Sequence, residues 1–412
     1  MFSIRPSEPA DCEAIYHRST ELFAEHVDQN ESARMSLDEF KAIHAERFVK
    51  FRVLTTGADV LEEADSDCCY SDLSADTGRR HRLPEYRDER IVGYIAFMND
   101  YDISFGGPGI LVDQLYICDR FRGKGHGRRL INCVQTEAIR KSAKYIKLFY
   151  QQNGEREAIY NRLGFESVTR DPPYIRLFEI YGAEEIRNRL NLNVYERVEE
   201  GIRTLPVKPG IEVVQYQQAH DSSTGYGSLI LSFSLTSEYD YPKFPSTRLI
   251  LVVKHSVRIH SLPGLFEINS LKRFLSQRGI SIDVPPLNLW NQISRQESTA
   301  NEVITEPDVR ICAFVERPTV CCWLGHQLTF NNFVGDLELV TKELLIQRVR
   351  AWSAKWGPIL GLNFEISGCQ ETQGLSTSST LVRMLNSLGI HGDPRTNCAV
   401  MVGDNIREIT AD

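Results

Sequence analysis

The residues best suited to chemistry form a glycine-rich segment, Leu115 to Arg128, with the sequence LYICDRFRGKGHGR. An apolar stretch comes first, then Gly123, Gly125 and Gly127 alternate with other residues, and a helical pattern follows at once. Such glycines let successive backbone N–H groups point toward one anion, and the dipole of the following helix adds positive potential. The segment therefore predicts a cradle for a phosphate, and best for a diphosphate.

Two other phosphate motifs do not fit this segment. A P-loop needs Gly-Lys followed by Ser or Thr, whereas Gly123-Lys124 is followed by another glycine. The dinucleotide fingerprint needs Gly-x-Gly-x-x-Gly, and the three glycines here are each separated by one residue. A glycine-rich turn taken alone is a weak signal, so the flanking elements must decide its meaning.

The elements around the loop are predicted from apolar periodicity. Residues 91–97 and 110–117 are expected to form two antiparallel strands joined by a turn at 106–109. The helix after the loop carries apolar residues at helical spacing, namely Leu130, Ile131, Val134 and Ala138. Further strands are expected at 4–6, 51–54, 145–150 and 174–180, with helices from Asp11, from the capping box at 36–39, and over 156–163.

This order of elements resembles the GNAT superfamily of acyl-CoA N-acyltransferases. The family's signature is Arg or Gln, two variable residues, Gly, one variable residue, and Gly or Ala, and it is met by Arg122, Gly125 and Gly127. Residues 112–117 resemble the family's splayed fourth strand, and 153–165 resemble its second CoA-contacting segment. The resemblance implies an α/β fold with a mixed, mostly antiparallel sheet and flanking helices.

The same resemblance implies that acetyl-CoA is bound as a co-substrate and that no metal is needed. Its pantetheine arm is expected to pair with backbone of Leu115, Tyr116 and Ile117. The expected pyrophosphate contacts are Arg122, Gly123, Lys124, Gly125, His126, Gly127 and Arg128, and the expected later CoA contacts are Asn153 and Arg156. For His126 we expect the backbone N–H to matter and the imidazole to face solvent.

Acyl transfer to an amine defines two catalytic roles. A primary amine attacks a thioester only when unprotonated, and its pKa of about 10 means that the site must remove a proton. Asp113 falls where amine-acetylating members carry an acidic residue, although theirs is a longer Glu, and it is our candidate for this role. Tyr160 falls where the family places a general acid for the departing thiolate, and its alternative role is that of a core aromatic.

The predicted function is an N-acetyltransferase that moves an acetyl group from acetyl-CoA to a primary amine by direct attack in a ternary complex. The motifs are most similar to those of enzymes that acetylate diamines and polyamines. Protein lysine and N-terminal acetyltransferases share the CoA motifs, so a lysine-type peptide acceptor stays an alternative. A rival function is a non-catalytic acyl-CoA-binding or scaffold protein whose second half binds a partner.

Composition excludes several other classes. A formal net charge of -8 without a clustered basic face argues against nucleic-acid binding. The apolar runs fall short of the roughly 20 residues that span a bilayer, so we expect no membrane insertion. Ten cysteines without a Cys-x-x-Cys pair indicate free thiols and no metal site, which fits a cytoplasmic or nuclear protein.

A length of 412 residues predicts at least two domains. We expect a GNAT domain at 1–182, with a charged surface insertion at 55–90, then a helical linker at 183–209 and an α/β or α+β domain at 210–412 that we do not recognise. The first domain is expected to fold alone and to hold every chemical group, while the second modulates acceptor choice or binds a protein partner. A tandem of two acyltransferase domains is disfavoured because Arg-x-x-Gly-x-Gly does not recur.

Overall fold

The structure is a computed structural model, and not every residue is described. The described residues are 2–24, 35–57, 89–151, 154–167, 175–181, 183–190, 205–208, 211–218, 227–235, 247–255, 272–273, 275–277, 279–299, 309–367, 378–392 and 396–402. Most of the expected insertion at 55–90 lies outside them, as do Asn153 and much of the expected linker.

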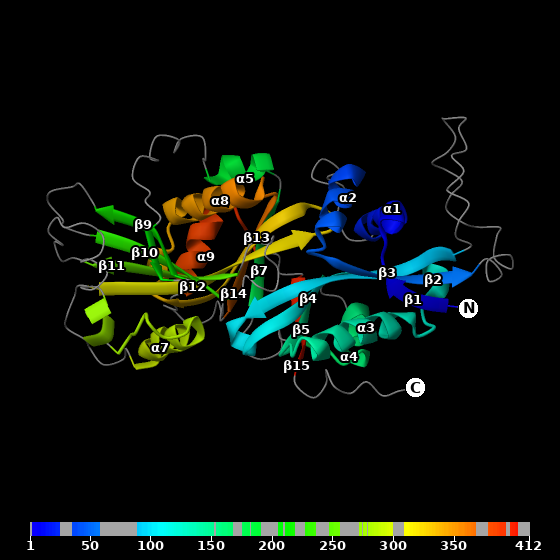
Figure 1. Cartoon of the computed structure of the whole chain (residues 1–412), viewed down its shortest axis with the longest axis horizontal. Coiled ribbons are helices and arrows are strands. Elements are labelled where there is room, and N and C mark those ends of the chain that lie inside the picture. Colours follow the sequence, from blue (N-terminus) through cyan, green and yellow to red (C-terminus); the bar gives the residue numbers. More distant parts are fainter. Residues whose placement is uncertain are drawn as a thin grey trace.

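The first sheet has seven strands and is mixed but mostly antiparallel, as predicted. Its order is β1 (Phe2–Pro6), β2 (Lys50–Gly57), β3 (Glu89–Asp102), β4 (Gly107–Ile117), β5 (Tyr145–Gln151), β15 (Thr396–Val402) and β6 (Glu166–Ser167). Only the β4–β5 pair is parallel. Helices α1 (Cys12–Ala24) and α2 (Leu37–Glu46) lie on one side of this sheet, and α3 (His126–Arg140) and α4 (Gly154–Arg162) on the other (Figure 1).

Local sequence signals account for these helices. The Ser36 side chain caps the Glu39 N–H of α2, and the Glu39 carboxylate accepts from the Ser36 N–H at 2.6 Å, which is the predicted capping box. Helix α3 buries the four predicted apolar residues, Leu130, Ile131, Val134 and Ala138, against the sheet. Helix α3 begins directly after the glycine loop. Its packing against the sheet therefore fixes the position of the loop.

The second sheet has eight strands and also contains one parallel pair, β13–β14. Its order is β7 (Ile175–Tyr181), β14 (Gly361–Ser367), β13 (Gly325–Gly335), β12 (Val309–Cys321), β11 (Arg248–His255), β10 (Gly227–Ser234), β9 (Ile211–Gln218) and β8 (Leu205–Lys208). Helices α5 (Ala183–Leu190), α8 (Lys342–Trp356) and α9 (Ser378–Ser387) share one core with it, and α7 (Pro286–Thr299) contributes to another. The second half is thus α/β, as expected.

The two sheets exchange a strand, which the sequence does not predict. The chain order places β7 as the last strand of the first sheet, but it pairs antiparallel with β14 in the second. Strand β15, near the end of the chain, enters the first sheet between β5 and β6. The expected boundary at 182 is therefore crossed in both directions, because an alternating pattern identifies a strand without naming its partner.

The two halves repeat one order of elements. In the first half the β3–β4 hairpin leads through α3 to the parallel strand β5 and then to α4. In the second half the β12–β13 hairpin leads through α8 to the parallel strand β14 and then to α9. After these elements each half contributes a strand to the other half's sheet: β7, which follows the short strand β6, joins the second sheet, and β15 joins the first. The sequence hides this repeat because its glycine loop occurs once.

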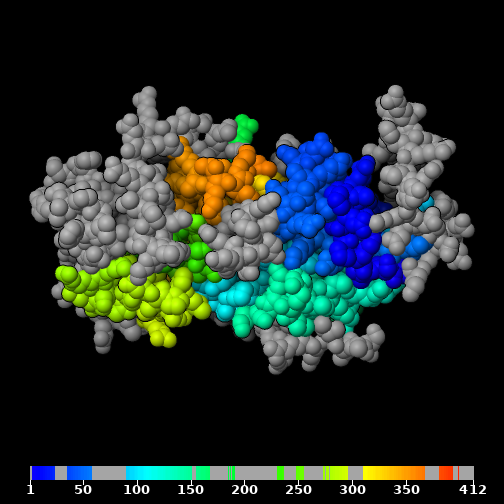
Figure 2. Space-filling model, viewed as in Figure 1, coloured from blue at the N-terminus to red at the C-terminus, as the bar shows by residue number. Residues whose placement is uncertain are grey.

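Each half also inserts a hairpin turn into the other. Cys322, in the turn between β12 and β13, is buried in the core of the first sheet together with Val320. Ile103, in the turn between β3 and β4, is buried in a core of the second sheet. The sequence pattern places Cys321, Cys322 and Trp323 together in a buried strand, whereas β12 ends at Cys321 and the next residues form the turn. The two halves lie side by side along the long axis of the molecule (Figure 2).

Buried charges join the two sheets at their centre. The Lys147 ammonium of β5 lies 2.7 Å from Glu365 of β14, 3.2 Å from Asp102 and 3.4 Å from Asp100. Arg317 of β12 pairs with Asp100 and, at 2.6 Å, with Glu365. Burial alone would lower the pKa of Lys147, but Glu365 and Asp102 outweigh it and raise that pKa above its usual value.

Candidate active site

The site begins where β4 and β5 part. The two strands pair only from Ile110 to Val112 on β4, opposite Ile146 to Leu148 on β5. Strand β4 continues beside β3 to Ile117, so its last residues lie outside the β4–β5 ladder. Leu115, Tyr116 and Ile117, the predicted pantetheine contacts, lie on this splayed arm.

A β-bulge marks the apex of the splay. Gln114 pairs with Ala96 and Val112 pairs with Phe97, so Asp113 is an extra residue in β4. Bulges bend a strand and redirect the side chain of the extra residue. The candidate base therefore occupies the point at which the two strands separate.

The glycine loop lies at the end of the same arm. Gly123 and Gly125 have φ angles of +75° and +81°, a region that favours glycine. Gly125 is the N-cap of α3 and has no side chain to cap the first-turn N–H groups. Among the described residues, nothing lies within 4 Å of a Cβ built at Gly123, Gly125 or Gly127. Open, uncapped donors of this kind are compatible with a diphosphate, which the sequence predicts here.

Basic side chains surround the loop in distinct roles. The Arg122 guanidinium donates to Ile117 O at 2.9 Å and pairs with Asp119 at 2.9 Å, so it fastens the loop to the end of β4. Arg128 donates to Arg162 O at 2.7 Å and thereby links α3 to α4. Lys124 is exposed beside the Phe121 ring, and Arg156 is half-buried on α4. Arg122 and Arg128 thus hold the loop as well as adding positive charge.

His126 differs from the prediction that its imidazole faces solvent. Its exposed fraction is 6%, and its ring centroid lies 4.4 Å from that of Phe2. Neither ring nitrogen has a hydrogen-bond partner among the described residues. Burial, together with Arg129 and Lys124, lowers the pKa of His126. The first helical residue therefore packs its ring on β1, and its backbone N–H stays the part that is expected to meet an anion.

Asp113 is held by the second half of the chain. The Cys322 N–H donates to Asp113 Oδ2 at 2.9 Å. Burial raises the pKa of Asp113 to about 6, although the Cys322 N–H and side chain both act to lower it. A carboxylate that titrates near 6 is mostly ionised at pH 7 and still basic enough to accept a proton.

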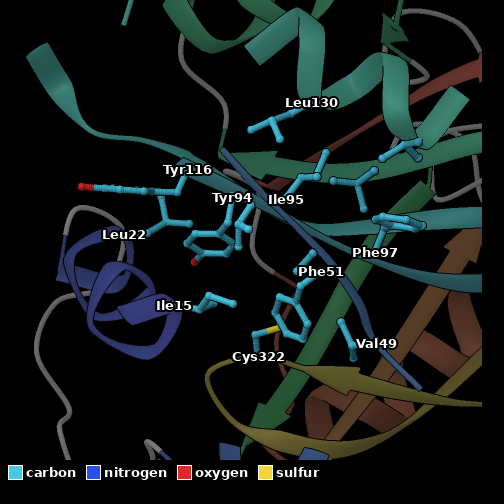
Figure 3. Packing of buried hydrophobic residues seen from close by; sticks show 14 of the residues in the cluster. Ile15, Leu22, Val49, Phe51, Tyr94, Ile95, Phe97, Tyr116, Leu130 and Cys322 are labelled. Atoms are coloured by element: carbon cyan, nitrogen blue, oxygen red, sulfur yellow. The ribbon is translucent and has the colours of Figure 1, made fainter. Parts of the chain in front are cut away.

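Several residues near Asp113 and Tyr116 were missed from the sequence, namely Arg18, Glu21, Tyr94 and Cys322, whereas Tyr116 itself was predicted as a site residue. Tyr94 is fully buried and donates to Gln114 Oε1 at 2.6 Å, and its ring stacks on Tyr116 with centroids 5.9 Å apart. The Tyr116 hydroxyl bonds to Glu21, which Arg18 holds at 2.7 Å. Figure 3 shows Cys322 beside Ile15 and Phe51, with the Tyr94 ring near them. No local motif singles these residues out, because they come from α1, β3 and a distant hairpin.

Tyr160 lies on α4, beside β5, the other arm of the splay. It is half-buried on α4, and its ring contacts those of Tyr150 and Phe165 at centroid distances of 5.3 and 6.0 Å. Tyr150 belongs to β5, just beyond the point at which β4 leaves it. Burial raises the pKa of Tyr160, so the hydroxyl stays protonated at neutral pH. A core aromatic and a proton donor are both compatible with this position.

The second half lacks an equivalent anion cradle at the described start of α8. Thr341 caps this helix by accepting from Leu344 N at 3.3 Å, and Glu343 lies in its first turn. Asp336 and Glu338 precede the helix and pair with Arg310. A side-chain cap already occupies a first-turn N–H of α8, and the acidic residues beside it make the site less favourable for an anion, so of the two corresponding helix starts that of α3 suits a diphosphate better.

Comparison with known families addresses this part of the chain. Residues 85–167 match the acetyltransferase (GNAT) domain. The matched segment is about one fifth of the chain and contains β3, β4, the glycine loop, α3, β5, α4 and β6. No curated protein matches the sequence.

Solved structures with similarity to the chain include GNAT proteins. A tandem GNAT protein from the clavulanic acid biosynthesis pathway, determined without acetyl-CoA, is 10% identical, covers 97% of each chain and gives a TM-score of 0.36. The PaiA N-acetyltransferase from Thermoplasma acidophilum, in complex with coenzyme A, is 13% identical over 42% of this chain and 93% of its own, with a TM-score of 0.27. An acetyltransferase from Trypanosoma brucei is 16% identical over 42% and 96%, with a TM-score of 0.27.

In the described part of the chain, no group of three or more His, Cys, Asp or Glu side chains is placed to hold a metal ion. None of the helices described is both long and apolar enough to cross a membrane.

Proposed function

We propose that the chain is an N-acetyltransferase that uses acetyl-CoA and a primary amine. One observation carries the proposal: the uncapped glycine loop lies directly beyond a splayed strand whose bulge presents Asp113. A diphosphate held by the loop points its attached arm along the splay, toward the carboxylate. The match of residues 85–167 to the GNAT domain supports the same reaction.

The roles of the side chains follow from the bonds that change. The amine nitrogen forms a bond to the acetyl carbon, and the bond from that carbon to the CoA sulfur breaks. Asp113, with a pKa of about 6, takes the proton that the amine loses. Tyr160 is the proposed donor of a proton to the leaving sulfur, since its raised pKa keeps it protonated.

A small amine is the acceptor class that the site favours over a lysine within a folded protein. The β12–β13 turn packs beside Asp113, with Trp323 O accepting from Met35 N at 2.8 Å and the Trp323 ring 5.1 Å from that of Phe23. This covering narrows the approach to the carboxylate. The Asp113 carboxylate also supplies negative charge that suits a cationic diamine or polyamine.

A thiol-release screen tests the proposal. The full chain is incubated with acetyl-CoA and a panel of diamines, polyamines, amino acids and lysine peptides, and acetylated products are identified by mass spectrometry. We expect turnover with a small amine. Stoichiometric acetyl-CoA binding without thiol release on any acceptor would instead support the rival function of a non-catalytic acyl-CoA-binding protein.

A further inference from the structure

We propose that the turn of the β12–β13 hairpin completes the catalytic site, with Cys322 as the positioning residue that holds the Asp113 carboxylate. The second half would then contribute directly to the chemistry, contrary to the division expected from the sequence. The proposal rests on the proposed function, because Asp113 is the base of that reaction.

The contact is direct and enclosed. The Cys322 N–H donates to Asp113 Oδ2 at 2.9 Å, and its thiol also interacts with the same carboxyl group. Cys322 is 1% exposed and belongs to the core of the first sheet, although it comes from the second half of the chain. Neighbouring backbone is fixed by the Met35 N–H, which donates to Trp323 O at 2.8 Å. The donor to Asp113 is thus rigidly placed.

The internal repeat contains a corresponding contact in which the bulge side chain is an amide and not a carboxylate. At the corresponding bulge of β13, Asn332 Oδ1 accepts from Ile103 N at 3.1 Å, in the turn of the other hairpin. The Asn332 amide also donates at 2.8 Å to Asp102 and to Ser104. Each half therefore holds the other's hairpin turn with a bulge side chain. An amide is sufficient for docking, so the carboxylate of Asp113 calls for a second role.

Hydrogen bonds from Cys322 should have a large effect on the pKa of Asp113, because the carboxyl group is buried. Cys322 is the titratable group that acts on the Asp113 carboxyl in the described structure, while Asp113 in turn acts on Tyr94 of β3 and Cys321 acts on Cys322. Hydrogen bonds to the ionised form lower a carboxyl pKa, whereas burial raises it. Removing the thiol donor while keeping the backbone N–H should therefore raise the pKa of Asp113.

The experiment compares three Cys322 states in the full chain. Wild type, Cys322→Ala and Cys322→Ser are labelled with aspartate bearing ¹³C at the carboxyl carbon, and Asp113→Asn assigns the Asp113 signal. Cys12→Ala is the matched control, since Cys12 is a buried cysteine of the same core. The pH titration of the signal is measured, together with kcat and KM for whichever amine wild type accepts.

We expect Cys322→Ala to raise the pKa of Asp113 by about half a unit or more, and to move the acidic limb of kcat/KM to higher pH by the same amount. Cys322→Ser, which keeps a donor, should restore most of the wild-type value, and Cys12→Ala should match wild type. An unchanged titration in Cys322→Ala, or an equal change in Cys12→Ala, would overturn the proposal. Because the NMR titration needs no turnover, a chain that acetylates nothing would refute the proposed function separately.

Discussion

Asp113 and Asn332 occupy corresponding bulges of the two halves, yet only Asp113 is ionisable. Both accept an N–H from the opposite hairpin turn. The position of Asp113 on the strand before the loop could be predicted from the sequence, because that strand and loop carry a recognisable pattern; its catalytic role stays a prediction. The environment of Asp113 could not, because Cys322 is separated from it by more than 200 residues and meets it only through the hairpin exchange.

The first prediction concerns the stability of Asp113→Asn. Burial raises the pKa of Asp113 to about 6 from an ordinary value of 3.8, so the folded state binds its proton more tightly than the unfolded state does. The stabilisation from this proton is complete below about pH 4 and is lost as the pH rises through about 6. The amide introduced by the substitution carries no charge to bury and can still accept the Cys322 N–H. We expect the variant to gain about 1–2 kcal/mol at pH 8 and almost nothing at pH 4.

Urea unfolding of wild type and Asp113→Asn over this pH range measures the difference. The reciprocal variant, Asn332→Asp, is unfolded in the same way. It places a carboxylate beside Asp102, at the bulge whose side chain accepts the Ile103 N–H. A variant Asp113→Asn that is less stable than wild type at pH 8 would mean that the ionised carboxylate is stabilised in place.

The second prediction concerns Tyr160→Phe. Removing a positioned general acid costs about a hundredfold to ten-thousandfold in turnover, while the ring contacts with Tyr150 and Phe165 are kept. We expect kcat to fall by such a factor with little change in the KM for acetyl-CoA. Steady-state kinetics measure kcat and KM, and a melting curve that matches wild type is the control for folding. A kcat within about threefold of wild type would leave Tyr160 with only a packing role.

At the scale of elements, α3 and α8 hold corresponding places but begin differently. Helix α3 starts from Gly125 without a side-chain cap, and α8 starts from Thr341 with one. This difference was visible in the sequence, because glycine spacing and capping residues are local signals. Strands β13 and β14 were not predicted, since polar residues such as the buried Asn331 and Glu365 and the half-buried Asn363 interrupt the apolar alternation that predicts a strand. Their neighbours in the fold come from distant parts of the chain, which a local pattern does not reveal.

The third prediction concerns Gly125→Glu at the start of α3. The substitution places a negative charge and a side chain where the open N–H groups would meet the diphosphate. It also strains the backbone, because φ at Gly125 is +81°. Gly279→Glu is the matched control, since Gly279 has a φ of +73° and also faces open space within the described structure.

Calorimetry with acetyl-CoA measures the result. We expect Gly125→Glu to weaken binding by at least about a hundredfold, roughly the loss of two charge-assisted hydrogen bonds, while Gly279→Glu binds as wild type does. Equal affinities for the two variants would remove the loop from the binding site.

At the scale of the whole molecule, strand exchange makes each half depend on the other. The pairing of β15 with β5 runs from Thr396 opposite Gln151 to Val402 opposite Tyr145. A fragment of residues 1–182 lacks β15 and leaves β5 with an open edge. The sequence predicted that this fragment folds alone, because periodicity finds strands but gives no information about which sheet they join.

The fourth prediction is that fragment 1–182 does not fold into a stable monomer. Exposed strand edges and an incomplete core favour aggregation. We expect the fragment to be insoluble or to lack a cooperative melting transition, and a co-expressed fragment 183–412 to recover soluble material containing both pieces. A fragment 1–182 that is monomeric, melts cooperatively and binds acetyl-CoA would show that the exchanged strand is dispensable.

The buried charges at the centre of the molecule carry the last prediction. Strands β5 and β14 correspond in the internal repeat, as do β3 and β12, and the charges on each corresponding pair are opposite: Lys147 faces Glu365, and Asp100 faces Arg317. Two copies of either half would place like charges together, so the arrangement favours the pairing of unlike halves.

Lys147→Met would leave three buried carboxylates to one guanidinium, and we expect the free energy of unfolding to fall by about 3–5 kcal/mol at pH 7. Lys147 and Arg317 hold the pKa of Glu365 below its usual value against the effect of burial, so the stability they give is present at neutral pH and is lost as the pH falls through that lowered pKa. The penalty of Lys147→Met should therefore shrink toward acidic pH, because the carboxylates left behind can take up protons. Urea unfolding at pH 5 and pH 7 tests this dependence. The control is Lys272→Met, which removes the half-exposed ion pair with Asp283 and should lower the free energy of unfolding by less than about 1 kcal/mol at both pH values. A loss of stability in Lys147→Met that is independent of pH would instead be assigned to packing of the lysine stem.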